Sequence, residues 1–408
     1  MFRTVILTLM LNARAFPRPI TERDRRIYSC LHARLPIKEL CGIIQHYAVE
    51  FQGLQYDPEY SQGYERADLW LRMGPIPVEG LCDLVAGFLE SLAGDYTGPL
   101  CVLPNGAIAW GANRKVALSN GIESMTLEPE PSDVSALVAF PDGNRVGIGT
   151  QSGLVAVWNT INQTLESMPK LCLGSVRSMV VLTDGKLAVG SSAQDLVVWD
   201  VDTKRCEWRW YSLTTSFVTL FPMVAMPHGM FASGSDDSLV RLWDITHLSI
   251  KVLSGHRHQV NALALLPDGA LASASSDKKV IVWDVHSGSC VRQLEGHSMP
   301  VVSLAVLSED RLAAGSMSNH ICVWDVLTGE CLQRLWGPGG PVRTLAVLID
   351  GTLASGSDDG TVEVWDPDSG ECVHFIRGHS GHAITHLAVL PNGQLVSGGL
   401  DNTMRFWK

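Results

Sequence analysis

Residues Leu263 to Asp284 read LALLPDGALASASSDKKVIVWD, and this stretch contains the pattern that organises most of the 408-residue chain. Short runs rich in Val, Leu and Ala alternate in it with the turn sequences Pro-Asp-Gly and Asp-Lys-Lys. Such runs are typical of β-strands, and glycine supplies the positive φ that a tight hairpin turn requires. Every position from Val280 to Trp283 is apolar, as expected of a strand covered on both faces of its sheet. The stretch therefore predicts antiparallel strands in a sheet that lies between other sheets.

The same pattern recurs along the chain, most clearly at residues 345–366 and 387–408. Seven copies are marked by a tryptophan, with separations of 41, 44, 40, 41, 41 and 42 residues between Trp158, Trp199, Trp243, Trp283, Trp324, Trp365 and Trp407. A period of about 40–45 residues fits one propeller blade per copy. An earlier copy without the tryptophan has a matching turn at 103–106 and places Ser119 39 residues before Trp158. We therefore count eight repeats, with seven blades and an outlying hairpin as the alternative.

This repeat resembles that of the WD-repeat β-propeller family, and the resemblance covers about three quarters of the chain. The Trp-Asp dipeptide is intact in five copies, beginning at Trp199, Trp243, Trp283, Trp324 and Trp365, and the Gly-His pair of the family occurs at His256, His297 and His379. The expected fold class is therefore all-β, a WD-repeat β-propeller, preceded by a small, mainly α N-terminal segment.

In the related family a buried Asp, His, Ser and Trp form a hydrogen-bond network, which we call the tetrad. The resemblance implies a complete tetrad in two copies, formed by His256, Ser273, Asp277 and Trp283 and by His379, Ser397, Asp401 and Trp407. The copies with Asp237 and Asp359 lack the His, and the sixth copy has Ser318 where Asp belongs. We expect the second, third and sixth blades to be less stable.

Ser, His and Asp also form the catalytic triad of hydrolases. Here the same trio recurs at the same repeat offset, whereas a catalytic site would be needed only once. A G-x-S-x-G elbow, a P-loop and an H-E-x-x-H pair are all missing from the sequence. We therefore predict no enzyme activity, no catalytic residue, no cofactor and no metal.

A propeller presents a broad rim of loops, which suits a protein or peptide partner better than a small-molecule substrate. In the related family the partner face is formed by the loops that lead into each innermost strand and by the turns beside the buried Asp. The resemblance places six residues of this chain there: Asp236, Arg257, His258, Lys278, Met299 and Asp358. We expect a non-enzymatic protein–protein interaction scaffold.

Ten cysteines are present, and four of them lie seven residues after a tryptophan, at Cys206, Cys290, Cys331 and Cys372. Equivalent positions in different blades are too far apart for a disulfide, so we interpret these residues as small buried hydrophobic side chains. The sequence has no C-x-x-C pair, the usual spacing for a structural zinc site or a redox dithiol. This cysteine usage favours a reducing, cytoplasmic location.

The net charge of −11 makes binding to nucleic acid unlikely, because such binding needs clustered Lys and Arg. No stretch approaches the roughly 18 apolar residues of a membrane-spanning helix, so we predict no membrane span. Residues Met1 to Ala15 have the outline of a signal peptide. However, Arg14 lies within the would-be cleavage motif, which favours an ordinary strand or helix.

The repeats divide the chain into an N-terminal segment, residues 1–87, and a propeller, residues 88–408. Because the chain ends after the third strand of the last blade, another segment must cover that edge. Residues 88–94 align with the outer strand that begins at Cys290, and we predict that they pair with the last blade and close the ring.

Residues 35–47 place Leu40, Ile43, Ile44 and Tyr47 at helical spacing after a proline. This segment resembles the first helix of an F-box, which implies an alternative function as a substrate receptor of a ubiquitin ligase complex. Packing of the helix on its own subdomain or on the propeller is the reading that we favour.

Overall fold

The structure is a computed structural model that describes residues 98–408, apart from 113, 120–123, 128–131, 169–173, 194, 212–219, 338, 380 and 408. Contacts divide the chain into two units, Met1–Leu89 and Glu90–Lys408, and all described residues belong to the second. The predicted helix at 35–47 and the predicted closing strand at 88–94 lie outside the described residues. Within the described part of the chain, no helix could span a membrane.

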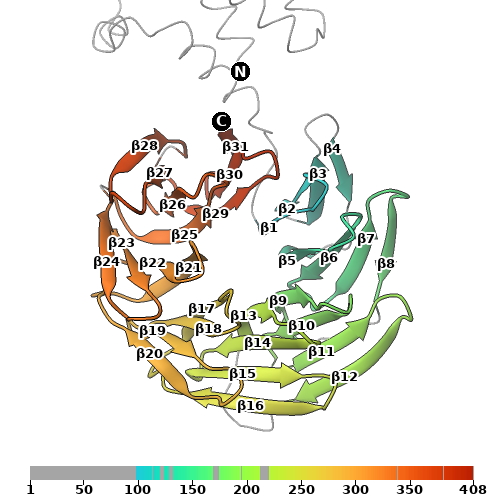
Figure 1. Cartoon of the computed structure of the whole chain (residues 1–408). Helices are drawn as coiled ribbons and strands as arrows, with labels where there is room; N and C mark the ends of the chain where they lie inside the picture. Colours follow the sequence, from blue (N-terminus) through green and yellow to red (C-terminus); the bar gives the residue numbers. More distant parts are fainter. Residues whose placement is uncertain are drawn as a thin grey trace, which may run out of the picture. The chain divides into compact units, whose positions relative to one another are not determined.

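The described residues form eight antiparallel sheets that lie side by side around a ring (Figure 1). Each sheet is a blade whose strands follow one another in sequence order. Blade 1 contains β1 (Leu100–Val102), β2 (Ile108–Ala112), β3 (Lys115–Ser119) and β4 (Ser124–Leu127). Blade 2 contains β5 (Val134–Ala139), β6 (Arg145–Thr150), β7 (Val155–Asn159) and β8 (Thr164–Ser167). Blade 3 contains β9 (Val176–Val181), β10 (Leu187–Ser191), β11 (Asp195–Asp200) and β12 (Arg205–Tyr211). Blade 4 contains β13 (Leu220–Ala225), β14 (Met230–Ser235), β15 (Leu239–Asp244) and β16 (Ser249–Ser254).

The remaining blades repeat this arrangement, except that the last has three strands among the described residues. Blade 5 contains β17 (Val260–Leu265), β18 (Leu271–Ser275), β19 (Val280–Trp283) and β20 (Cys290–Leu294). Blade 6 contains β21 (Val301–Val306), β22 (Arg311–Ser316), β23 (His320–Asp325) and β24 (Cys331–Trp336). Blade 7 contains β25 (Val342–Val347), β26 (Leu353–Ser357), β27 (Thr361–Trp365) and β28 (Cys372–Arg377). Blade 8 contains β29 (Ile384–Val389), β30 (Leu395–Gly399) and β31 (Met404–Trp407).

Burial within a blade depends on the distance of the strand from the ring axis. In blade 5 every position of β18 and β19 is buried, whereas four of the five positions of the outermost strand β20 are exposed. The first strands of successive blades, such as β17 and β21, neighbour one another and line the centre of the ring. The middle strands are apolar on both faces because a blade covers each face.

Eight buried apolar clusters hold the ring together, one at each interface between neighbouring blades. Between blades 5 and 6, for example, Trp324 packs in one cluster with Ala274 and Leu294. The cluster that joins blade 8 to blade 1 contains Trp110 together with Met404. Because this last interface is also packed, the ring is closed.

The prediction of eight blades is confirmed, and the alternative of seven with an outlying hairpin is wrong. In blade 1, Ile108 pairs with Ser119, the same register in which Leu271 pairs with Trp283 in blade 5. Ser119 therefore occupies the position of the tryptophan, and β1 to β4 form a complete four-stranded sheet. Loss of the indole did not remove the blade, because its other apolar residues still pack against both neighbours.

The interpretation of the four equivalent cysteines as buried residues is wrong. Cys206, Cys290, Cys331 and Cys372 are all exposed. Each is the first or second residue of an outermost strand, where neighbouring blades no longer cover the sheet. Each thiol donates a weak hydrogen bond to the carbonyl oxygen two residues later, as Cys290 does to Arg292 at 3.5 Å.

Candidate partner-binding face

Strand direction alternates within a blade, so two kinds of connection share one face of the ring. These are the loops from the outer strand of one blade into the innermost strand of the next, and the turns between the second and third strands. We call this surface the entry face. On blade 5 it is formed by residues 255–259 and 276–279, which precede β17 and β19.

The tetrad of blade 5 ties these two connections together. His256 Nδ1 lies 2.9 Å from Asp277 Oδ2, and His256 Nε2 lies 2.8 Å from Ser273 Oγ. Trp283 Nε1 donates to the same Ser273 Oγ at 2.7 Å. The loop that contains His256 is therefore anchored to the turn that contains Asp277.

The order of donors in this network follows from its chemistry. An indole N–H can only donate, so Ser273 accepts from Trp283 and its own hydrogen is left for His256 Nε2. His256 then carries its hydrogen on Nδ1 and donates to Asp277. Burial would raise the pKa of Asp277, but hydrogen bonds from the Arg257 backbone N–H and from His256 lower it. The carboxylate thus stays charged and fixes the loop.

Blade 8 repeats the tetrad with nearly the same distances. His379 Nδ1 lies 2.9 Å from Asp401 Oδ1 and His379 Nε2 lies 2.7 Å from Ser397 Oγ, while Trp407 Nε1 donates to Ser397 at 2.8 Å. Burial lowers the pKa of His379, and the hydrogen bond to Asp401 opposes this effect. Ser273 and Ser397 are both fully buried, so no substrate carbonyl could reach either hydroxyl.

The other blades that keep an Asp in this turn stabilise it differently. In blade 4, Arg241 donates to Asp237 at 2.5 Å in place of a histidine, and Trp243 Nε1 donates to Ser233 at 2.8 Å. In blade 7, Asp359 accepts from the Thr361 hydroxyl at 2.6 Å. A charged or hydroxyl side chain from the following strand thus replaces the loop histidine.

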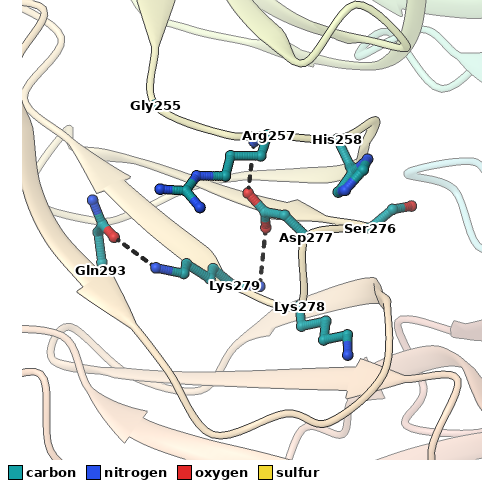
Figure 2. A pocket seen from close by; sticks show the side chains of 8 residues that line it. All are labelled: Gly255, Arg257, His258, Ser276, Asp277, Lys278, Lys279 and Gln293. Atoms are coloured by element: carbon teal, nitrogen blue, oxygen red, sulfur yellow. Dashed lines mark hydrogen bonds between the residues drawn. The ribbon is translucent and has the colours of Figure 1, made fainter.

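Three of the six residues that were predicted to face a partner lie together on blade 5 (Figure 2). Arg257, His258 and Lys278 line a cavity of about 340 Å³ on the entry face. The other lining residues are Gly255, Ser276, Asp277, Lys279 and Gln293. We call this hollow the blade 5 pocket.

Positive charge dominates the blade 5 pocket. Lys279 Nζ is neutralised by Glu295 at 2.6 Å and also donates to Gln293 at 3.1 Å. The Arg257 guanidinium and the Lys278 ammonium group are exposed and form no ion pair within the described part of the chain. The backbone at Lys278 has a φ of 74°, a left-handed conformation that glycine adopts more readily. Two unpaired cations beside a shallow cavity suit an anionic group.

The other three predicted rim residues lie on different blades. Met299 is 46% exposed on the loop before β21. Asp358 of blade 7 forms an ion pair with Arg343, and Asp236 of blade 4 accepts from the Ser235 hydroxyl at 3.3 Å. The structure thus groups the cationic residues and leaves the two acidic residues in local contacts of their own.

Lys279 and Gln293 were not predicted, because their place beside the pocket depends on pairing across strands.

The opposite face carries an apolar hollow that the sequence did not indicate. A cavity of about 530 Å³ is lined by turn residues of blades 1, 2, 7 and 8, including Pro104, Pro141, Ile349 and Pro391.

The Trp-Asp dipeptides also end at this face, where Asp325 Oδ1 accepts from the backbone N–H of Leu327 at 2.8 Å. Asn159 makes the same kind of contact with Ile161 at 3.0 Å, so the Asn of blade 2 caps its turn as Asp does elsewhere.

Glu363 of blade 7 gives a testable pH dependence. Its side chain is buried in β27, and burial, aided by the charge of Asp359, raises its pKa to about 7. A carboxyl group with a raised pKa is protonated in the folded state, so stability falls as pH rises from about 4.5 to about 7. Replacing Glu363 by Gln should therefore raise the free energy of unfolding at pH 8 by roughly 3 kcal/mol. Near pH 5 the two proteins should differ little.

Urea denaturation of both proteins at pH 5 and pH 8 measures this effect. Asp350→Asn is a matched control, because that carboxylate is exposed and hydrogen-bonds to Thr352. The control should lose stability slightly at pH 8, since the pKa of Asp350 is lowered. Equal stability of wild type and Glu363→Gln at pH 8 would contradict the assignment.

Known sequences and structures share this architecture. The sequence profile of the family "WD domain, G-beta repeat" matches residues 224–244, 248–284, 288–325, 329–366 and 370–408. Among solved structures, the computationally designed Ika8 protein is similar over 78% of this chain and 97% of its own, with a TM-score of 0.66 and 25% identity. A chain of the Mitotic Checkpoint Complex is similar over 65% of this chain and 83% of its own, with a TM-score of 0.56 and 22% identity. No curated protein sequence matches the chain significantly.

Proposed function

We propose, from the premise that this chain belongs to the WD-repeat β-propeller family, that it is a non-enzymatic scaffold whose entry face binds a protein or peptide partner. Propellers of this family generally serve as scaffolds and typically bind proteins. The blade 5 pocket carries the proposal, because Arg257 and Lys278 present unpaired positive charge around a cavity of about 340 Å³. Such a site fits an acidic segment of a partner, with His258 beside it as a further polar contact.

Two features favour a peptide over a diffuse charge contact. The tetrad holds the loop at Arg257 in one position, so little conformational entropy is lost when a partner binds. The Arg257 guanidinium can also form two parallel hydrogen bonds to one carboxylate, whereas Lys278 acts as a point charge. An acidic side chain on an extended peptide is the occupant that this arrangement fits best.

Reversing the two charges should abolish capture of the partner. We expect that Arg257→Glu/Lys278→Glu in the full chain removes at least one protein that the wild type enriches after affinity purification and mass spectrometry. The matched control is Arg205→Glu/Arg377→Glu, which changes the net charge equally on the exposed outer strands β12 and β28. The control should retain the partner.

The proposal is wrong if the double variant and the control enrich the same proteins. Enrichment of nucleic acid instead of protein, with an affinity that falls steeply with salt, would also contradict it. The net charge of −11 argues against that outcome, because the chain as a whole repels phosphate.

The second hypothesis, a substrate receptor of a ubiquitin ligase complex, depends on residues 35–47, which lie outside the described residues. Its support is the apolar stripe with Leu40 and Ile43 at helical spacing. The same purification separates the two hypotheses. A ligase adaptor should be enriched by the wild type and lost on Leu40→Asp if the second is right, whereas the scaffold hypothesis expects no such adaptor.

A further inference from the structure

Blade 6 lacks the residues that complete the tetrad. Strand register places Ala314 where blade 5 has Ser273, because Leu312 pairs with Trp324 as Leu271 pairs with Trp283. Ser318 likewise occupies the position of Asp277. As a consequence, His297 Nε2 and Trp324 Nε1 are buried without a hydrogen-bond partner within the described residues.

Two further side chains converge on His297. His320, the first residue of β23, stacks on it with ring centroids 4.9 Å apart and 24° between the planes. Cys322 Sγ lies 3.9 Å from His297 Nδ1. His297, His320 and Cys322 form what we call the blade 6 cluster, whose donor atoms all lie within 4.8 Å of one another.

The blade 6 cluster is buried, and three of its four ring nitrogens form no hydrogen bond within the described residues. The exposed fractions are 8% for His297, 4% for His320 and 0% for Cys322. Both ring nitrogens of His320 lack a hydrogen-bond partner of normal geometry in the described part of the chain, as does His297 Nε2, although backbone groups of Gly296 and Ala314 lie close enough to act on the two rings. Buried polar atoms are rarely left in this state, so three unpartnered nitrogens beside a thiol indicate a missing ligand.

The chemistry of these donors selects a class of ligand. Thiolate and imidazole together are the donor set of Zn²⁺ and of Cu⁺, and three protein donors are enough for a site with one open position. A neutral imidazole has a lone pair on one ring nitrogen, and that atom would bind the cation. A cysteine binds a metal as its thiolate, so Cys322 would release its proton when a cation binds.

We propose that His297, His320 and Cys322 bind a thiophilic metal cation, Zn²⁺ or Cu⁺, between the entry face and the core of blade 6. In a tetrahedral zinc site, bonds of about 2.0–2.1 Å to nitrogen and about 2.3 Å to sulfur place neighbouring donor atoms roughly 3.3–3.6 Å apart. The Cys322–His297 separation of 3.9 Å is close to this value. The donor atom of His320 lies within 4.8 Å of the other two, so the side chains would have to move closer together to complete the site.

The positive charge of a neighbouring arginine affects how tightly the blade 6 cluster can bind a cation. Arg334 is close enough to repel positive charge at both His297 and His320, so it also opposes an incoming cation. The thiolate of Cys322 would offset this repulsion when it forms. Cu⁺ with one thiolate gives a neutral centre, whereas Zn²⁺ leaves a net positive charge, so the two metals should differ in affinity.

The test is metal titration of the full chain under reducing conditions. Because exposed thiols bind metals loosely, the reference protein is Cys206→Ser/Cys290→Ser/Cys372→Ser, which removes three of the four exposed cysteines of the outermost strands. Cys331 is kept because its thiol interacts with that of Cys322, so the blade 6 cluster stays intact. We expect it to bind one equivalent of Zn²⁺ in competition with a chromophoric chelator, or one equivalent of Cu⁺ in competition with a Cu⁺-specific chelator. Bound metal should also raise the melting temperature.

A second protein adds His320→Lys/Cys322→Ile to the reference. These are the residues that blade 5 has at the same positions, Lys279 and Ile281, so the blade should still fold. Loss of two metal ligands should weaken binding by more than the roughly 10- to 100-fold that is lost when a residue that only orients a ligand is removed. The metal-induced rise in melting temperature should disappear, while the melting temperature without metal confirms folding.

Co²⁺ provides a readout that is independent of affinity. Tetrahedral thiolate coordination gives intense visible bands, which should appear in the reference protein and be missing from the His320→Lys/Cys322→Ile protein. The proposal is overturned if neither Zn²⁺ nor Cu⁺ binds the reference protein, or if both proteins bind with the same affinity and spectrum. The three side chains would then be a packing cluster without a ligand.

Discussion

Replacing Ser273 by alanine should lower the free energy of unfolding by about 2–5 kcal/mol, because two buried polar groups lose their partner at once. Trp283 Nε1–H loses its acceptor, and His256 Nε2 loses the hydroxyl that donates to it. Trp283 lies in the apolar cluster between blades 4 and 5, and the side chain of His256 is fully buried. The effect therefore exceeds that of an exposed hydrogen bond.

Urea denaturation of Ser273→Ala measures the loss, with Ser254→Ala on the exposed outer strand β16 as the control. Hydrogen exchange should also accelerate in β18 and β19 until it approaches the rate in β22 and β23, where Ala314 already stands in the serine position. A loss below about 0.5 kcal/mol, the range of ordinary surface substitutions, would contradict a structural role for the tetrad.

Deleting residues 88–94 should lower the melting temperature by on the order of 10 °C or more. Blade 8 has three strands among the described residues, so the outer edge of β31 has no partner strand there. If residues 88–94 pair with β31, their loss exposes a row of unpaired backbone groups and uncovers the apolar residues next to them. The ring would then be held at this point only by the cluster that joins blades 8 and 1.

A deletion of the same length at residues 74–80 is the control, because the sequence there predicts a connector with several Pro and Gly residues. A complementary variant, Leu89→Pro, keeps the chain length and removes one backbone donor within the predicted strand. Melting curves of both variants that coincide with those of the wild type would show that another segment covers β31.

The repeat made the fold predictable from sequence, because an error in one copy is corrected by the others. Ser119 could be placed in β3 from the spacing of later tryptophans, although blade 1 has no indole at that position. Burial was harder to predict, as the four equivalent cysteines show. Their repeat offset fixed the strand on which they lie, but not that outermost strands extend beyond the cover of neighbouring blades.

The residues of the candidate site could be predicted from the sequence only where they occupy the same position in each repeat. The tetrad of blade 5 could be assigned by offset, and so could the place of Arg257 and Lys278 on two connections of the same face. The pairing of Lys279 with Glu295 could not, because it depends on the lengths of side chains across β19 and β20. The blade 6 cluster is also invisible to motif searches, since its members come from a loop and from a strand that follows two others.

The left-handed backbone at Lys278 has a consequence for the redesign of the repeat. Glycine holds the same turn position in blades 2 and 7, at Gly153 and Gly360, with φ values of 85° and 83°. A redesign that places glycine at 278 as well would relieve the strain of a side chain in this conformation. The same change would remove the Lys278 ammonium group from the blade 5 pocket. A chain built from identical repeats would therefore be more stable, but it would lose the charge that distinguishes blade 5 from the other blades.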